Sequence, residues 1–212
     1  MPADHYLAIV TASKKIQVKD LSAWENQACY SGQIHLCDFD GDGDDEIALQ
    51  QTVSMTGGAG QYLSRVFDYS GGEIVEIFIS NDGEGCCFDM GYTATVLKDR
   101  RLRIDNSFTG FSMTLQYGEG NDELFDTWWY DENGDPKESF LLVDSFYSFA
   151  PKDDDGDGVY EIHCRQYTSL IGHANYIGDA VSVLKYNKDS GKFEMIEAGF
   201  EPLVDSYVEI VE

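Results

Sequence analysis

Two short acidic segments carry the residues best suited to chemistry. Residues 38–47 read DFDGDGDDEI and residues 153–162 read DDDGDGVYEI. In both, Asp stands at positions 1, 3 and 5, Glu stands at position 9, and glycines at positions 4 and 6 let the backbone curl. Alternate carboxylates then converge on one point, where they repel one another unless a hard divalent cation lies among them. The pattern therefore predicts two metal sites.

The ligand chemistry favours calcium. Ca²⁺ accepts about six to eight oxygens at flexible geometry, and the position-7 carbonyls of Asp44 and Val159, with water, could complete its shell. Mg²⁺ requires a tighter octahedron, and neither segment offers the His or Cys that zinc prefers. An EF-hand is excluded because its bidentate Glu at position 12 is replaced by Leu49 and Cys164, and because both segments run on into strands.

The two segments resemble the acidic loops of FG-GAP and VCBS repeats, which occur in integrin-like β-propellers and in many bacterial surface proteins. In that family a D-x-D-G-D-G-x-x-D/E loop holds calcium between two strands of a blade. The resemblance is strong over roughly residues 32–80 and 149–198. It implies one ion bound by Asp38, Asp40, Asp42, the Asp44 carbonyl and Glu46, and a second bound by Asp153, Asp155, Asp157, the Val159 carbonyl and Glu161.

The rest of the chain reads as short strands separated by Gly, Asn, Asp and Ser. The expected strands are 32–39, 46–54, 62–69, 73–80, 92–98, 101–105, 112–117, 124–131, 139–149, 161–168, 179–186 and 192–198. A short helix is expected only around residues 20–28, behind an Asp cap. We therefore predict an all-β fold of antiparallel sheets, arranged as a small or incomplete β-propeller-like repeat domain, with a β-sandwich as the alternative.

The acidic segments also head an internal repeat with an offset of 115 residues. Each is followed by a strand, a glycine-rich connection, a second strand, a hairpin turn and a third strand. This pattern predicts one domain over residues 1–212, with repeat units at about 32–80 and 149–198 and a degenerate unit between them.

Composition limits the possible partners and location. The chain has 39 acidic against 14 basic residues, for a net charge of −25, so it repels phosphate backbones and anionic lipids, and we expect no nucleic acid partner and no membrane insertion. The five cysteines form no zinc-like CxxC pair, and we interpret them as mostly structural thiols. Calcium loops of this kind fill at extracellular calcium levels, so we expect a secreted or cell-surface bacterial protein whose leader is absent from this sequence.

Two other features deserve a structural test. Asp131, Asn133 and Asp135 imitate a third acidic loop, but Pro136 follows them and position 9 is Ser139, so a hairpin turn is the preferred interpretation. Trp128 and Tyr130 alternate along a predicted strand and could share a face that stacks on a sugar, although core packing is the alternative we favour.

No motif for a nucleophile, a phosphate loop, a dinucleotide or a zinc protease occurs, so we expect no catalytic residue. The sequence predicts a non-enzymatic, calcium-stabilised monomer that binds two Ca²⁺ ions and serves binding or scaffolding, with an unknown protein or glycan as its partner. A carbohydrate-binding module is one alternative. The other is a hydrolytic enzyme that uses a carboxylate pair in a pocket away from both loops.

Overall fold

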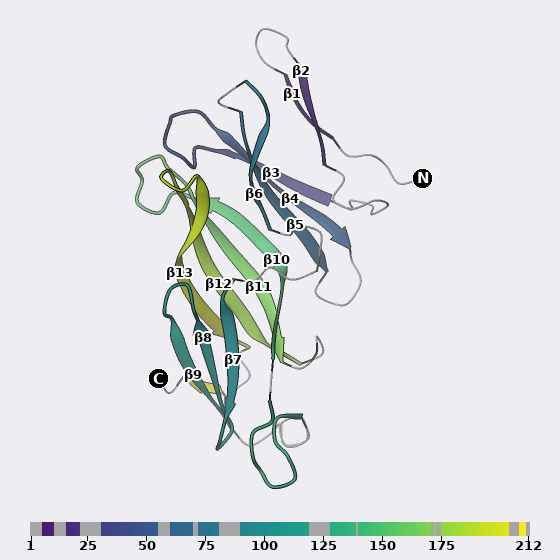
Figure 1. The fold of residues 1–212 in the computed structure, drawn as a ribbon, viewed down its shortest axis with the longest axis vertical. Helices are drawn as coiled ribbons and strands as arrows, with labels where there is room; N and C mark the ends of the chain where they lie inside the picture. The colour runs from purple at the N-terminus through teal and green to yellow at the C-terminus, as the bar shows by residue number, and fades with distance from the viewer. Residues whose placement is uncertain are drawn as a thin grey trace.

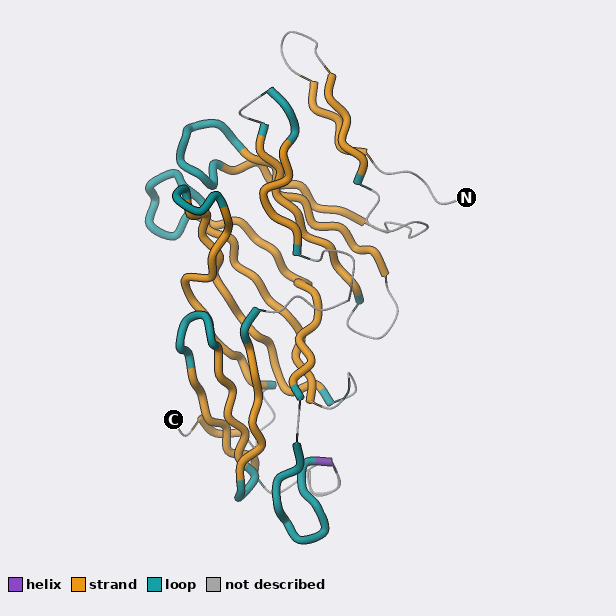
Figure 2. The backbone as a smooth tube through the Cα atoms, in the orientation of Figure 1, coloured by secondary structure: helices purple, strands orange, loops and turns teal. Residues whose placement is uncertain are grey.

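The computed structural model covers residues 1–212 and is almost entirely built of strands and turns (Figures 1 and 2). It describes residues 6–10, 16–21, 31–54, 60–69, 72–80, 90–118, 128–138, 140–170, 172, 175–203 and 208–210. Within these ranges the only helical residue is Trp128, and no helix has the length and hydrophobicity needed to span a membrane. The all-β prediction is confirmed.

The described strands form four antiparallel sheets, none of which closes into a barrel. The first acidic-loop sheet has the order β3 (Ser31–Cys37), β4 (Glu46–Ser54), β5 (Gln61–Asp68) and β6 (Val75–Ile79). The second acidic-loop sheet has the order β10 (Leu141–Lys152), β11 (Glu161–Leu170), β12 (Tyr176–Asn187) and β13 (Lys192–Pro202). The third sheet has the order β14 (Val208–Ile210), β9 (Ser112–Tyr117), β8 (Arg101–Asn106) and β7 (Tyr92–Leu97). The fourth is the hairpin of β1 (Tyr6–Val10) and β2 (Ile16–Asp20).

The two acidic-loop sheets have the same topology. In each, four consecutive strands pair in chain order, and the acidic loop connects the first strand to the second. β3 therefore corresponds to β10, β4 to β11, β5 to β12 and β6 to β13. In both sheets, the strand that follows the acidic loop is followed by two further strands that pair in chain order.

Some predicted elements differ from the structure. The N-terminal strands β1 and β2 were not anticipated, and Asp20, the expected helix cap, is the last residue of β2. The remainder of the predicted helix, from residue 22, lies outside the described residues. The strand predicted at 124–131 is not formed in its described part, where Trp128 is helical and Tyr130 makes an isolated bridge to Pro136.

Alternation along the strands builds the core. On β11, Ile162, Cys164 and Gln166 are at most 2 % exposed and face inward, while the residues between them face the opposite side. The third sheet contributes a matching row of fully buried side chains, Leu102, Ile104 and Leu115. The inner face of the second acidic-loop sheet and the third sheet therefore share one core.

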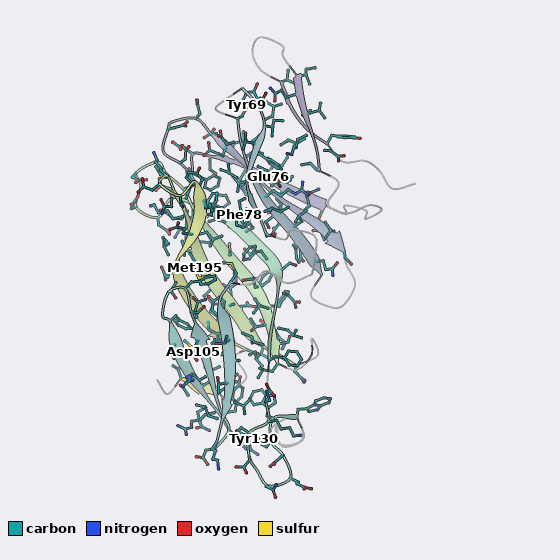
Figure 3. All side chains as sticks on the ribbon, viewed as in Figure 1. Tyr69, Glu76, Phe78, Asp105, Tyr130 and Met195 are labelled. Carbon is teal, nitrogen blue, oxygen red and sulfur yellow. The ribbon has the colours of Figure 1, made fainter. Side chains whose placement is uncertain are left out.

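Aromatic contacts join the two acidic-loop sheets. Phe78 on β6 stacks on Phe149 of β10, with ring centroids 5.6 Å apart, and meets Phe193 of β13 edge-on at 5.6 Å (Figure 3). Phe39, at position 2 of the first acidic loop, also meets Phe193 edge-on, at 5.5 Å. This loop is thereby anchored to the second sheet through a side chain that is 1 % exposed.

The hairpin β1–β2 packs on the outer face of the first acidic-loop sheet. Leu7 and Leu21 join Leu49 and Phe67 in a small core of their own. The side chain of Gln17 accepts a hydrogen bond from the Ile74 amide (3.2 Å). The hairpin therefore covers the part of this face around Leu49 and Phe67, while Ile34 and Leu36 of β3 stay exposed on the same face.

Candidate functional site

The first acidic loop is organised by its own carboxylates. Asp38 accepts hydrogen bonds from the amides of Gly41, at 2.5 Å, and Gly43, at 2.9 Å, through its two oxygens. Asp40 accepts from the Asp42 amide at 2.9 Å, and Asp42 accepts from the Asp44 amide at 2.8 Å. The loop is closed by side chain–backbone bonds of the kind that Asp makes readily in turns.

The second loop repeats every one of these bonds 115 residues later. Asp153 accepts from the amides of Gly156 (2.7 Å) and Gly158 (3.1 Å). The remaining bonds run to Asp155 from the Asp157 amide, at 3.1 Å, and to Asp157 from the Val159 amide, at 2.7 Å. Gly41 and Gly156, at the same position of the two loops, have φ of +68° and +79°, a conformation that side chains with a Cβ rarely adopt.

The carboxylates converge as the spacing predicts. In each loop, ligand oxygens from the Asp residues at positions 1, 3 and 5 lie within 4.8 Å of one another. Partial burial, followed by the neighbouring carboxylates of Asp42 and Asp38, raises the pKa of Asp40 above its ordinary value. An all-oxygen set of negative groups at this separation matches the chemistry of a hard divalent cation.

The position-9 glutamates are buried behind the loops but differ in their partners. Glu46 is 2 % exposed and accepts a hydrogen bond from the Phe39 amide at 2.8 Å. Burial raises the pKa of Glu46 to about 7, and the Asp40 and Asp68 charges add to the shift. Glu161 is 4 % exposed and forms an ion pair with Lys185 through Oε1, while its buried Oε2 has no hydrogen-bond partner.

The two loops touch each other. The amide of Tyr160 in the second loop donates to the carbonyl of Asp38 in the first, at 2.8 Å. A Cβ placed on Gly41 would lie 3.0 Å from Cγ2 of Val159 and 3.3 Å from Nζ of Lys188. The two candidate sites therefore form one connected region at one side of the molecule (Figure 1).

Lys185 and Lys188 are neighbours of the site that sequence reasoning missed. Lys185 pairs with Glu161, and the charge of Lys188 acts on Asp40. Both lie at the end of β12 and in the following turn, far along the chain from the first loop. No spacing in the sequence places them at the loops, since only the pairing of β12 with β11 brings them there.

The segment from Asp131 to Asp135, which resembles a third acidic loop in sequence, forms a hairpin-like turn. Asp131 accepts hydrogen bonds from the amides of Asn133 (2.8 Å) and Asp135 (2.9 Å), while Asp135 forms an ion pair with Lys98 at 2.9 Å. One of its acids is thus already paired with a cation of the chain.

The two aromatic residues proposed as a sugar platform have different surroundings. Tyr130 is 7 % exposed and donates its hydroxyl hydrogen to the Leu97 carbonyl at 2.6 Å, whereas Trp128 is 48 % exposed. Tyr130 lies near the end of the molecule remote from the acidic loops (Figure 3). The pair does not present two exposed rings.

A family model described as the YybI C-terminal domain matches residues 90–201, a little over half of the chain. The chain belongs to the YybI C-terminal domain family. The YybI match covers β7, β8 and β9 of the third sheet and runs through β10, β11, β12 and nearly all of β13. It excludes β14 and the first acidic loop. Comparisons with curated proteins and with solved structures gave no match.

This membership corrects the resemblance to FG-GAP and VCBS repeats, which is wrong. The family that matches is the YybI C-terminal domain; of the two segments that carried the resemblance, the match contains residues 153–162, which it extends well beyond, and excludes residues 38–47. A ten-residue Asp–Gly turn is a local solution to the problem of bringing carboxylates together, because it needs only glycines and side chain–backbone bonds. Such a turn does not determine the family of the chain around it.

Proposed function

We propose that this chain is a calcium-stabilised β domain that binds one Ca²⁺ ion in each acidic loop and serves binding or scaffolding. The observation that carries the proposal is the repetition of the same carboxylate–amide bonds in two loops that head two sheets of equal topology. The three Asp residues of each loop also hold oxygens within 4.8 Å of one another, a separation at which a shared cation would relieve their repulsion.

The residues present fit a hard cation. The Asp residues of each loop offer only oxygen ligands. The buried Oε2 of Glu161 has no hydrogen-bond donor, and a cation would supply the missing partner. In the proposed sites the residues at positions 1, 3, 5 and 9 supply carboxylates and the residue at position 7 supplies a carbonyl. A bound ion would neutralise mutual repulsion and fix the loop between two core strands.

A secreted or cell-surface location accompanies this proposal. A site that binds calcium with a dissociation constant of about 10⁻⁵ M lies within the span of known calcium sites and fills at the calcium levels found outside cells. For the architecture we propose an open, propeller-like series of repeat units, in which the two acidic-loop sheets are related units. Their common strand order supports this arrangement.

Isothermal titration calorimetry on a chelator-stripped sample tests the proposal. We expect two Ca²⁺ ions per chain, and we expect Asp40→Asn and Asp155→Asn each to remove one ion. Glu73→Gln is the matched control, since it removes an exposed carboxylate outside both loops. A stoichiometry of zero or one, or an equal loss of binding in the control, would refute the assignment.

A further inference from the structure

The outer face of the second acidic-loop sheet carries a groove that the calcium proposal does not use. Its volume is about 290 Å³, at the low end of the range for small-molecule sites. Val181 and Gly199, paired across β12 and β13, both line it. His163 and Glu197 line it in the neighbouring row, and Arg165 and Glu201 complete it. With Ser148 of β10, four strands contribute to one hollow, which Gly199 deepens by having no side chain.

A buried carboxylate fixes one wall of this groove. Asp179, 7 % exposed, accepts hydrogen bonds from the hydroxyls of Tyr147, at 2.6 Å, and Tyr176, at 2.7 Å. It also pairs with Nη2 of Arg165 at 3.0 Å. Burial, together with the hydrogen bond to Asp179, raises the pKa of Tyr147 to about 12, so this hydroxyl remains a donor at any physiological pH.

Almost every N–H group of the Arg165 guanidinium donates a hydrogen bond within the chain. Its Nε donates to the Tyr147 hydroxyl at 2.8 Å, and its two terminal nitrogens bind the carboxylate of Glu201. The guanidinium charge is therefore balanced by Asp179 and Glu201, which leaves one N–H of Nη1 for a ligand. A side chain held in this way is already in place before a ligand arrives, so little conformational entropy is lost on binding.

Tyrosine rings lie beside this wall. Tyr147 and Tyr167 stack in parallel with centroids 4.2 Å apart, and Tyr176 meets Tyr167 edge-on at 5.5 Å. All three rings are partly exposed on the outer face. They offer apolar surface next to a row of fixed polar groups.

We propose that this groove binds a neutral, hydroxyl-rich ring, that is, a sugar residue of a glycan. An anionic ligand is disfavoured because Arg165, the one guanidinium among the described residues that line the groove, is neutralised and the chain carries a net charge of −25. The groove instead alternates donors and acceptors: Arg165 donates, and Glu197 accepts because its carboxylate makes no hydrogen bond within the described part of the chain. Hydroxyl groups satisfy both kinds of partner, and the carbon faces of the ring suit Val181 and Val183, which line the groove, with the tyrosines as further apolar surface beside it.

Saturation-transfer difference NMR on the full chain tests this proposal. The probes are the methyl glycosides of glucose, galactose, mannose and N-acetylglucosamine, added at millimolar concentration. We expect transfer to at least one of them, and we expect Glu197→Ala to weaken its binding by about tenfold or more through loss of one hydrogen bond to a charged acceptor. Gly199→Val, which fills the floor of the groove, should abolish it.

Lys192→Ala is the matched control, because Lys192 is exposed at the far end of β13 and does not line the groove. It should bind the glycoside like the wild type. Unchanged melting temperatures would show that Glu197→Ala and Gly199→Val keep their fold. Transfer to none of the four probes, or binding that survives both groove variants, would overturn the proposal. The groove does not depend on a bound ion, so its failure would leave the calcium titration unaffected.

Discussion

The two acidic-loop sheets are alike at one edge and different on their outer faces. Both begin with a strand, a carboxylate-closed loop and a second strand that starts with a buried Glu. The outer face of the first sheet packs in part against the hairpin β1–β2 through Leu7 and Leu21, and its one buried guanidinium among the described residues, Arg65, pairs with Glu76. The outer face of the second sheet instead carries the tyrosines, Arg165 and Asp179. The acidic loop is therefore a structural feature common to both sheets, whereas the outer faces differ in the residues they present.

The loops themselves differ at position 9. Glu46 faces only backbone donors and like charges, whereas Glu161 has a lysine partner. Two equivalent positions therefore have unequal electrostatics, and this inequality is open to measurement.

The largest expected effect is the removal of calcium from both loops. If each site binds at about 10⁻⁵ M, two sites contribute about 5 kcal/mol of unfolding free energy at about 1 mM calcium. For a chain of this size that corresponds to a fall in melting temperature of about 10–20 °C on chelation. If the loops are equivalent, Asp40→Asn and Asp155→Asn should each reduce the calcium-dependent difference in melting temperature by about half. Calorimetric melting at pH 7 measures the effect, and equal melting temperatures with calcium and with chelator would show that the loops are empty turns.

A smaller effect is expected on the pH dependence of the unfolding free energy, through the buried Glu46, when calcium is chelated. Burial raises the pKa of Glu46 from 4.5 to about 7, so the fold favours its neutral form. Its contribution is fully present below pH 4.5 and is lost as pH rises through 7, at a cost of about 3 kcal/mol. Urea unfolding in chelator from pH 4.5 to 7.5 should show Glu46→Gln losing less stability with pH than the wild type. A wild-type slope in Glu46→Gln would contradict the assignment.

The smallest expected effect tests the contact between the loops. Gly156→Ala meets no atom within 4 Å and should cost only the strain of its positive φ, about 1 kcal/mol. Gly41→Ala has the same strain and also presses on Val159 and Lys188, so it should cost about 2 kcal/mol. Urea unfolding at 1 mM calcium compares the two variants. An equal loss would mean that the loops do not press on each other in solution.

Local patterns predicted most of the strands because alternation and turn residues are local signals. β4 occupies the predicted residues 46–54, and both loops bring their carboxylates together as their spacing required. The strand predicted around Trp128 failed because aromatic content alone favoured it, while Trp128 is helical in the structure. The N-terminal hairpin, YLAIV and IQVKD, was missed because residues 11–15 between its strands, TASKK, lack the Gly, Asn or Asp that marks a hairpin turn.

The groove and the contact between the loops could not be predicted in this way. Tyr147, Arg165, Asp179 and Glu201 come from four different strands, and they meet only because β10 to β13 pair in a particular register. Alternation places each of them on a face but does not say which residue lies opposite which. The β-bulges in β10 near Phe146 and Ser148 shift that register further.

The bond between the Tyr160 amide and the Asp38 carbonyl also has a consequence for how the chain folds. It joins residues more than a hundred positions apart, so the first loop reaches its final neighbours only after most of the chain has been laid down. Contacts this distant in sequence must close a long segment of unfolded chain before they return any stability, which slows folding. During synthesis from the N-terminus, the first acidic loop therefore stays without this contact, with its negative charges exposed, until the second loop has been synthesised.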